Sequence, residues 1–253
     1  MQMDLAGRAA LVTGGGRGIG RAIALALAEA GADIAVNYRR DADAADEVVH
    51  AVEAMGRKAR AYGASVENWD EDQVMAAAVV ADFPNLSILI NNAGIASRGQ
   101  SVADTDPAEM ERVVRVHAFG PHYLCKLLLP QLRTQGRADI VMISSVATLG
   151  MGARGAPYNM GKAAMEALAL TLAKEEREHG VRTNIVAPSL TVTEMGKRLT
   201  RATTGIEDIH QLDARSPFGR VSTPEDVAAV VTFLVSPANP YANGQKVNIN
   251  GGG

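Results

Sequence analysis

The fold is decided near the start of the chain by the stretch Ala9-Ala10-Leu11-Val12-Thr13-Gly14-Gly15-Gly16-Arg17-Gly18-Ile19-Gly20. An aliphatic run is followed by a glycine-rich turn, and residues 19–30 then have the apolar spacing of a helix. Such a turn directs backbone N–H groups and the positive end of the helix toward the space above the strand. The predicted ligand of this loop is a phosphate group.

Short aliphatic runs alternate with helical patterns along the rest of the chain. We expect seven strands, at residues 9–13, 33–38, 58–62, 87–91, 139–143, 182–187 and 246–249. Helices are expected between them, at about residues 19–30, 43–55, 70–82, 106–133, 158–179 and 224–234. Strict alternation requires parallel strands with right-handed crossovers, and strands that are apolar throughout are covered on both faces. The sequence therefore predicts an α/β fold, a single Rossmann-like doubly wound seven-stranded parallel sheet with helices on both faces.

Length and composition agree with one large domain. The chain has 253 residues, of which 47% are hydrophobic, and α/β folds reach this length as one unit. No linker rich in Pro, Gly and Ser divides it, so residues 1–253 are predicted to form one domain. Residues 189–222 carry no clear periodic pattern, and we expect them to form an irregular, mobile flap over the substrate.

Charge and cysteine content exclude several classes of partner. The 25 basic and 28 acidic residues give a net charge of −3, which creates no field that would hold a nucleic acid. The apolar runs are too short to span a membrane. A single cysteine, Cys125, and a start without a basic leader favour a cytoplasmic protein. No metal site is predicted.

The spacing Tyr158-x-x-x-Lys162, preceded by Pro157, places a phenol and an ammonium on one face at the start of a helix. The cation and the helix N-terminus are both expected to favour the phenolate and to lower the pKa of Tyr158. Ser145 ends the apolar strand before this helix, at the sheet edge where open α/β folds bind ligands. On spacing alone, Tyr158 and Lys162 are also compatible with two solvated neighbours.

Taken together, the motifs resemble the short-chain dehydrogenase/reductase family over about residues 5–190. The glycine loop fits Thr-Gly-x-x-x-Gly-x-Gly, and Asn91-Asn92-Ala93-Gly94 and the Ser145, Tyr158 and Lys162 set are further strings typical of the family. The resemblance implies that Tyr158 gives a proton to a carbonyl oxygen, that Ser145 hydrogen-bonds the same oxygen, and that Lys162 holds the nicotinamide ribose. The domain would then be both dinucleotide-binding and catalytic. Besides Tyr158 and Lys162, the expected cofactor contacts are Gly14, Arg17, Gly18, Ile19, Gly20, Arg39, Ser65, Val66, Asn92, Ala93, Gly94, Pro188 and Thr193.

The cofactor preference is predicted from the end of the second strand. An acid that binds the ribose 2′-hydroxyl would be expected there, but the sequence has Tyr38-Arg39-Arg40. The guanidinium groups of Arg17 and Arg39 are suited to a 2′-phosphate, so NADP(H) is favoured over NAD(H). Whether Arg40 takes part or only solvates the loop is left open.

Three positions depart from the family pattern. His117 stands where an asparagine usually helps to hold a relay water, so we expect it either to continue the relay, with an inflection of the pH profile near its ordinary pKa of about 6.5, or to be a structural residue. Ser189 replaces the usual glycine after Pro188. Ser65 replaces the acid that often recognises adenine, which predicts weaker adenine binding.

The leading interpretation is an NADP(H)-dependent ketone reductase or alcohol dehydrogenase, most like a 3-oxoacyl-thioester or related carbonyl reductase. The stretch 217–226 is also similar to the 3-oxoacyl-[acyl-carrier-protein] reductase branch. The alternatives are a cofactor-binding sensor or pseudoenzyme without useful turnover, and a domain that binds another phosphate ligand.

A partner subunit is predicted from the two longest helices. They carry apolar residues on more than one face, and a helix that covers a sheet needs only one apolar stripe. The resemblance makes the expected assembly a homotetramer. The residues are Val113, Leu124, Leu127, Leu128, Met165, Leu168 and Leu172.

Overall fold

The centre of the protein is a seven-stranded parallel sheet. The computed structural model describes residues 3–252, and the strands of that part lie in the order β3-β2-β1-β4-β5-β6-β7. They are β1 (Ala9–Val12), β2 (Asp33–Tyr38), β3 (Ala59–Gly63), β4 (Leu86–Asn91), β5 (Ala138–Ile143), β6 (Val181–Pro188) and β7 (Lys246–Ile249). Every bound lies within one residue of its predicted position, so the predicted fold class is confirmed.

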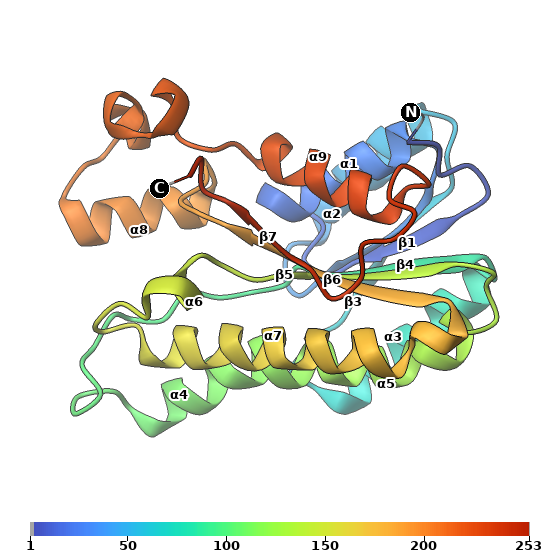
Figure 1. Ribbon diagram of the computed structural model, residues 1–253, viewed down its shortest axis with the longest axis horizontal. Helices are drawn as coiled ribbons and strands as arrows, with labels where there is room; N and C mark the ends of the chain where they lie inside the picture. Colours follow the sequence, from blue (N-terminus) through green and yellow to red (C-terminus); the bar gives the residue numbers. More distant parts are fainter. Residues whose placement is uncertain (1–2, 253) are drawn as a thin grey trace.

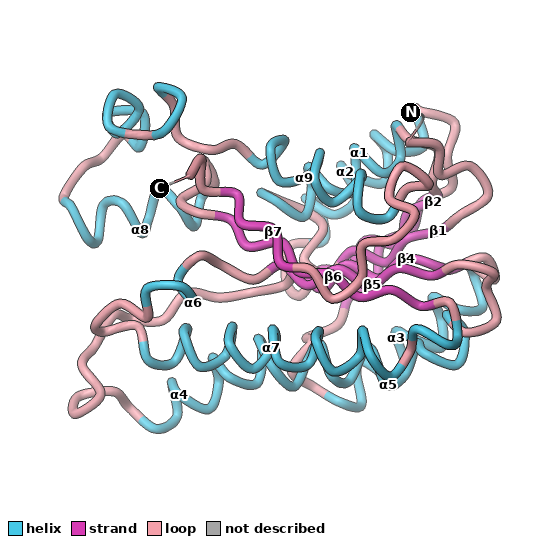
Figure 2. Tube along the Cα trace, in the orientation of Figure 1, coloured by secondary structure: helices cyan, strands magenta, loops and turns pink. Residues whose placement is uncertain are grey.

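Two layers of helices enclose the sheet (Figures 1 and 2). One contains α1 (Gly18–Glu29), α2 (Ala42–Ala54) and α9 (Pro224–Val235), and the other contains α3 (Trp69–Asp82), α4 (Pro107–Val114), α5 (Gly120–Leu132) and α7 (Ala156–Glu175). Ala10 and Val12 of β1 belong to the core under the first layer, whereas Ala9 and Leu11 belong to the core under the second. Alternate residues therefore serve opposite faces, which explains why the strands are apolar throughout.

The helix predicted at residues 106–133 is wrong in part: the chain is helical from Pro107 to Leu132, but it is not α-helical throughout. Between α4 and α5 the chain forms a π-helical segment, η1 (Arg115–Phe119). Pro121 lies in the first turn of α5, and because proline has no N–H it cannot donate to the carbonyl of residue 117. The pair Gly120-Pro121 was the sequence signal for this change of helix type. Single π turns are frequent at functional sites, and this one contains His117.

The prediction of an irregular stretch at residues 189–222 is also wrong in part. It contains α8 (Glu194–Thr204) and two 3-10 turns, η3 (Ile209–Arg215) and η4 (Pro217–Gly219). Figure 1 shows that α8 and these turns extend beyond the end of the sheet at which β7 finishes. Two further short elements were not predicted separately, α6 (Ala147–Gly150) and η2 (Arg177–His179).

Most of the apolar residues that suggested a second helix face belong to the core of the single chain. Val113, Leu124, Leu128 and Met165 are 0% exposed and Leu172 is 5% exposed. Leu127 and Leu168 are half-buried and pack against the same core. These residues therefore give no argument for a partner subunit, and the reasoning that used them is wrong.

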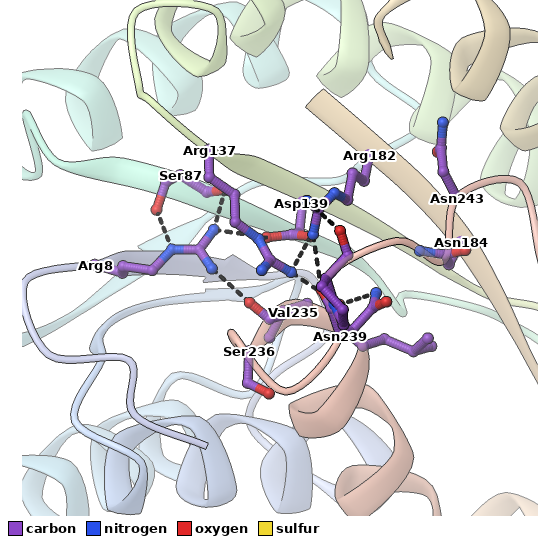
Figure 3. Close-up of polar contacts among 12 residues, drawn as sticks. Arg8, Ser87, Arg137, Asp139, Arg182, Asn184, Val235, Ser236, Asn239 and Asn243 are labelled. Atoms are coloured by element: carbon purple, nitrogen blue, oxygen red, sulfur yellow. Dashed lines mark hydrogen bonds and ion pairs between the residues drawn. The ribbon is translucent and has the colours of Figure 1, made fainter. Parts of the chain in front are cut away.

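At the amino ends of the strands, a cluster of Arg8, Arg137 and Asp139 links the sheet to the end of α9 (Figure 3). The buried carboxylate of Asp139 accepts from Arg8 at 2.9 Å and from Arg137 at 3.0 and 3.1 Å. Arg8 also donates to the carbonyl of Val235, and Arg137 donates to that of Leu234. The cluster thus satisfies carbonyls that the last turn of a helix leaves unpaired. In residues 3–252, no helix is both long and apolar enough to cross a membrane.

Candidate active site

The glycine loop lies at the carboxyl end of β1, where the strand order reverses between β1 and β4. Gly14 and Gly18 have φ values of +60° and +54°, which only glycine adopts readily. A Cβ on Gly20 would lie 2.3 Å from the carbonyl oxygen of Gly14, so the helix can approach the loop only without a side chain there. Ile19 follows Gly18 in the first turn of α1. The topological switch point is the ligand position of such sheets.

The Asn-Asn-Ala-Gly string supports this loop. The Nδ2 atom of Asn92 donates to the carbonyls of Thr13 at 2.8 Å and Gly14 at 3.2 Å. The hydroxyl of Thr13 accepts from the backbone N–H groups of Asn92 and Ala93, both at 2.9 Å. Gly94 leaves room for the His117 ring, because a Cβ there would lie 2.8 Å from Cε1. The string therefore fixes the loop and the region around His117 together.

The N-terminus of α1 has the character of an anion site. Its N-cap residue, Arg17, makes no side-chain capping hydrogen bond, and no acidic residue lies in the first turn. The first N–H groups of a helix have no partner within the helix and carry the positive end of its dipole. A dinucleotide pyrophosphate fits these donors and the close approach that the glycines permit.

The two predicted arginines differ in their surroundings. Arg17 is exposed at the start of α1. Arg39 follows β2 and forms an ion pair with Glu67, whose Oε1 lies 3.4 Å from Nη1. The sequence reasoning missed Glu67 because it follows β3 in the chain and meets Arg39 only through the pairing of β2 with β3.

Ser65 and Val66 follow β3, next to the end of β2. The backbone N–H of Ser65 donates to Glu71 at 2.7 Å. Val66 is buried, and its carbonyl lies so close to Gly120 that a Cβ on that glycine would be 2.6 Å away. Both residues lie where cofactor contacts were predicted, but their described contacts hold α3 and α5 in place.

The structure brings Ser145 and Tyr158 together. Ser145 follows β5, and Tyr158 lies in the first turn of α7 after Pro157. Burial raises the pKa of Tyr158, and a hydrogen bond with Ser145 opposes this shift in part. The predicted lowering of the Tyr158 pKa is therefore wrong, because burial outweighs the hydrogen bond with Ser145. Tyr158 is a protonated phenol at neutral pH.

Lys162 lies one turn after Tyr158 and is buried. Its Nζ donates to the carbonyl of Ile143 at 2.6 Å and lies 5.8 Å from the centre of the Tyr158 ring. Burial lowers the pKa of Lys162 to about 7, and the carboxylate of Glu166 opposes this shift. The four-residue spacing thus correctly predicted that Tyr158 and Lys162 are neighbours, but it did not predict how burial shifts their pKa values.

His117 faces the ring of Tyr158 edge-on, with the ring centres 5.2 Å apart. Its Nε2 lies 2.8 Å from the carbonyl oxygen and 3.3 Å from the backbone nitrogen of Ile95, and the shorter contact, to the carbonyl oxygen, favours the tautomer with the proton on Nε2. Nδ1 then has a free lone pair, and it has no hydrogen-bond partner within residues 3–252. Burial and the charge of Lys162 lower the pKa of His117 to about 3. The expected titration near pH 6.5 is therefore wrong, because the ring stays neutral.

Pro188 and Thr193 lie at the carboxyl end of β6 and in the segment that follows it. Pro188 ends β6, and its carbonyl accepts from the N–H of Val146 in the turn after Ser145. Thr193 caps α8 through Gly196, and its methyl group would meet a Cβ on Gly18 at 3.4 Å. The segment before α8 thus lies close to the glycine loop. Ser189 donates its N–H to Ile249, and the serine is accommodated without positive φ.

Comparison with known proteins agrees with this geometry. Residues 14–253 match the family model described as enoyl-(acyl carrier protein) reductase. The 3-oxoacyl-[acyl-carrier-protein] reductase FabG of Staphylococcus epidermidis is 34% identical over 97% of this chain and 98% of its own length. The solved 7α-hydroxysteroid dehydrogenase complexed with NADH and 7-oxo glycochenodeoxycholic acid has a TM-score of 0.91 at 30% identity, with 100% of this chain and 96% of that chain covered.

A short-chain dehydrogenase from Burkholderia cenocepacia, solved in complex with NADP, has a TM-score of 0.87 at 32% identity and covers 98% of both chains. The chain belongs to the short-chain dehydrogenase/reductase family of oxidoreductases. Within that family it is similar to the 3-oxoacyl-[acyl-carrier-protein] reductase branch.

Proposed function

We propose that this protein is an NADP(H)-dependent reductase that transfers a hydride to a ketone, with a 3-oxoacyl thioester or a related carbonyl compound as substrate. The observation that carries the proposal is the meeting of Ser145, Tyr158 and Lys162 at the sheet edge that also holds the glycine loop. These three groups are complete, which speaks against the alternative of a sensor or pseudoenzyme. When bound, the nicotinamide supplies the hydride.

The protein groups then act on the carbonyl oxygen. Ser145 donates a hydrogen bond to it, and Tyr158 delivers the proton as negative charge develops there. The raised pKa of Tyr158 keeps the proton in place until that moment, which suits the direction of reduction. Lys162 would hold the ribose hydroxyls of the nicotinamide nucleotide. The neutral His117 contributes the unpartnered lone pair of Nδ1 as an acceptor for a relay water.

The preference for NADP(H) rests on Arg17 and Arg39 and on the lack of an acid at the end of β2. A relative with a bound NADP supports this choice, and another with a bound NADH shows why it needs a test.

The segment 189–222 covers the substrate in this proposal. Thr191 forms a bridge with Ser222, so the two ends of the segment lie together, and Thr193 lies beside Gly18. A segment closed at its base and extended at its tip can shield the reacting carbonyl from water.

We also propose that the protein forms a homotetramer in the cytoplasm. Family resemblance supports the assembly, and exposed apolar side chains remain on the α5 and α7 side, where Phe119 is 43% and Leu170 44% exposed. The free buried thiol of Cys125 agrees with a reducing compartment. Light scattering at micromolar concentration tests the assembly: a particle four times the chain mass is expected, and a 26.5 kDa particle refutes it.

Loss of NADPH absorbance in the presence of a panel of ketones tests the activity. The panel contains a short 3-oxoacyl thioester, a cyclic ketone and an oxidised sugar, and each is offered with NADPH and with NADH. Turnover of at least one carbonyl compound, which disappears in Ser145→Ala, is the expected result. Binding of NADPH without turnover of any member contradicts the proposal and favours the sensor.

A further inference from the structure

A charged pair joins α7 to β7 beside the turn that carries Ser145. Glu166 lies one helical turn after Lys162, and Lys246 is the first residue of β7. The Nζ of Lys246 lies 2.9 Å from Oε1 and 3.0 Å from Oε2 of Glu166. The two side chains are only 21% and 16% exposed, so the pair is partly shielded from water.

Glu166 contacts the turn that carries Ser145, residues 144–148, on both sides of that serine. Its Oε1 accepts from the hydroxyl of Ser144 and lies 2.7 Å from the hydroxyl of Thr148, whose single proton is shared between this carboxylate and the Ser145 carbonyl at 2.8 Å. Lys246 donates to the same Thr148 hydroxyl at 2.6 Å. Thr148 is in turn bonded to Ser145, because its backbone N–H donates to the Ser145 carbonyl at 3.2 Å. The residue before Ser145 and the residue three positions after it are thus tied to one carboxylate.

The same face of α7 carries the rest of the site. Tyr158, Lys162 and Glu166 follow each other at intervals of four residues, which places them along one side of a helix. Lys162 donates to the carbonyl of Ile143, the last residue of β5, and Glu166 accepts from the hydroxyl of Ser144, the residue that follows. The helix that presents Tyr158 therefore also fixes the strand end that presents Ser145.

We propose that Glu166 and Lys246 are positioning residues that hold the Ser145 hydroxyl in register with Tyr158, an inference that rests on the proposed reductase function. Both hydroxyls must reach the same substrate oxygen, and a displacement well under 1 Å weakens such a paired contact. Lys246 keeps the Glu166 carboxylate facing the turn and compensates its charge. The C-terminal strand thereby contributes to the site without touching substrate.

Glu166 also changes the pKa of Lys162, which a residue that only held the turn in place would not do. Its carboxylate opposes the burial that lowers the pKa of Lys162. The other titratable groups facing Lys162 are Tyr158 on α7 and His117 on η1, and both are neutral near pH 7. Lys246 faces Glu166 from β7. Glu166 is therefore the charge that partly restores the pKa of Lys162 against the effect of burial.

The experiment compares Glu166→Gln with Ser144→Ala, with Lys246→Met and with a matched control, Glu175→Gln, an exposed residue near the end of the same helix. We expect kcat for ketone reduction to fall by about 10- to 100-fold in Glu166→Gln and by a smaller factor in Ser144→Ala. The Kd for NADPH should stay within about twofold of the wild type. Combining Glu166→Gln with Lys246→Met should cost less than the product of the two single losses, because both act through one contact.

The pH profile separates positioning from general damage. The alkaline limb of kcat should move to lower pH in Glu166→Gln, because Lys162 loses its proton earlier, and should stay unmoved in Ser144→Ala, which keeps the charge. Equal kcat in Glu166→Gln, Ser144→Ala and the Glu175→Gln control overturns this inference alone. A loss of kcat accompanied by an equal loss of NADPH binding also overturns it, because the defect is then general. If Glu166→Gln does not fold, Ser144→Ala decides. A wild type without any turnover overturns the proposed function and this inference with it.

Discussion

The contact between Arg39 and Glu67 sets the size of the expected cofactor preference. This pair is 3.4 Å apart, with side-chain exposures of 39% and 22%, and an exposed pair of this kind contributes about 0–1 kcal/mol. A charge-assisted hydrogen bond to a 2′-phosphate contributes about 1.5–3 kcal/mol. The phosphate therefore displaces Glu67 from Arg39, with a net gain of about 0.5–3 kcal/mol. We expect NADPH to bind about 2- to 150-fold more tightly than NADH.

The variant Arg39→Asp should reverse this preference, because it repels the phosphate and offers an acceptor to the 2′-hydroxyl. Arg40→Asp is the matched control, since it makes the same change of charge at the neighbouring exposed residue. Glu67→Gln removes the competing carboxylate and should raise NADPH affinity by up to about fivefold, with NADH affinity unchanged.

The assay is titration of each cofactor, by calorimetry or by quenching of protein fluorescence, at one fixed ionic strength because exposed charges are screened by salt. Equal affinities of the wild type for NADPH and NADH would refute the reasoning. So would equal changes in Arg39→Asp and Arg40→Asp, because the effect would then come from net charge and not from the contact.

Three further predictions follow from buried groups. His117→Ala should lower kcat by about tenfold while His117→Asn retains activity, and the wild-type pH profile should lack an inflection near pH 6.5, because the pKa of His117 is lowered to about 3; equal kcat in wild type and His117→Ala makes the residue structural. The side-chain oxygens of Asp72 are buried without a hydrogen-bond partner in the described chain, and burial raises the pKa of this carboxyl to about 8. The pKa in the folded state therefore exceeds the unfolded value of about 3.9. The contribution of Asp72 to stability is full below about pH 3.9 and is lost as the pH rises through about 8. The Tm should therefore fall over this window in wild type and less in Asp72→Asn, and parallel Tm curves would contradict this. Asp139→Asn should lower the free energy of unfolding by about 3 kcal/mol in urea, since it leaves Arg8 and Arg137 without their charge partner; a change under about 0.5 kcal/mol would show that the cluster contributes little.

The strands and the glycine loop could be predicted because their signals are local. An apolar run such as Ile140 to Ile143 identifies a strand covered on both faces, and Gly14, Gly18 and Gly20 specify a turn that few other residues permit. The four-residue spacing of Tyr158 and Lys162 likewise predicted two neighbours on one helix face.

The electrostatics of the site could not be predicted in the same way. The pKa values of Tyr158 and His117 depend on how completely the assembled fold removes them from water, and a spacing carries no information on burial. Glu67 and Lys246 act through contacts 28 and 80 residues away in the chain. These partners are determined by strand order, which only the folded structure specifies.

The central claim is that Tyr158 delivers a proton to a carbonyl substrate, and Tyr158→Phe tests it most directly. The substitution removes only the hydroxyl and keeps the ring that packs against His117. With a ketone that the wild type reduces, we predict that kcat falls by about 10²- to 10⁴-fold while the Kd for NADPH changes by less than about twofold. Turnover close to that of the wild type would contradict the account.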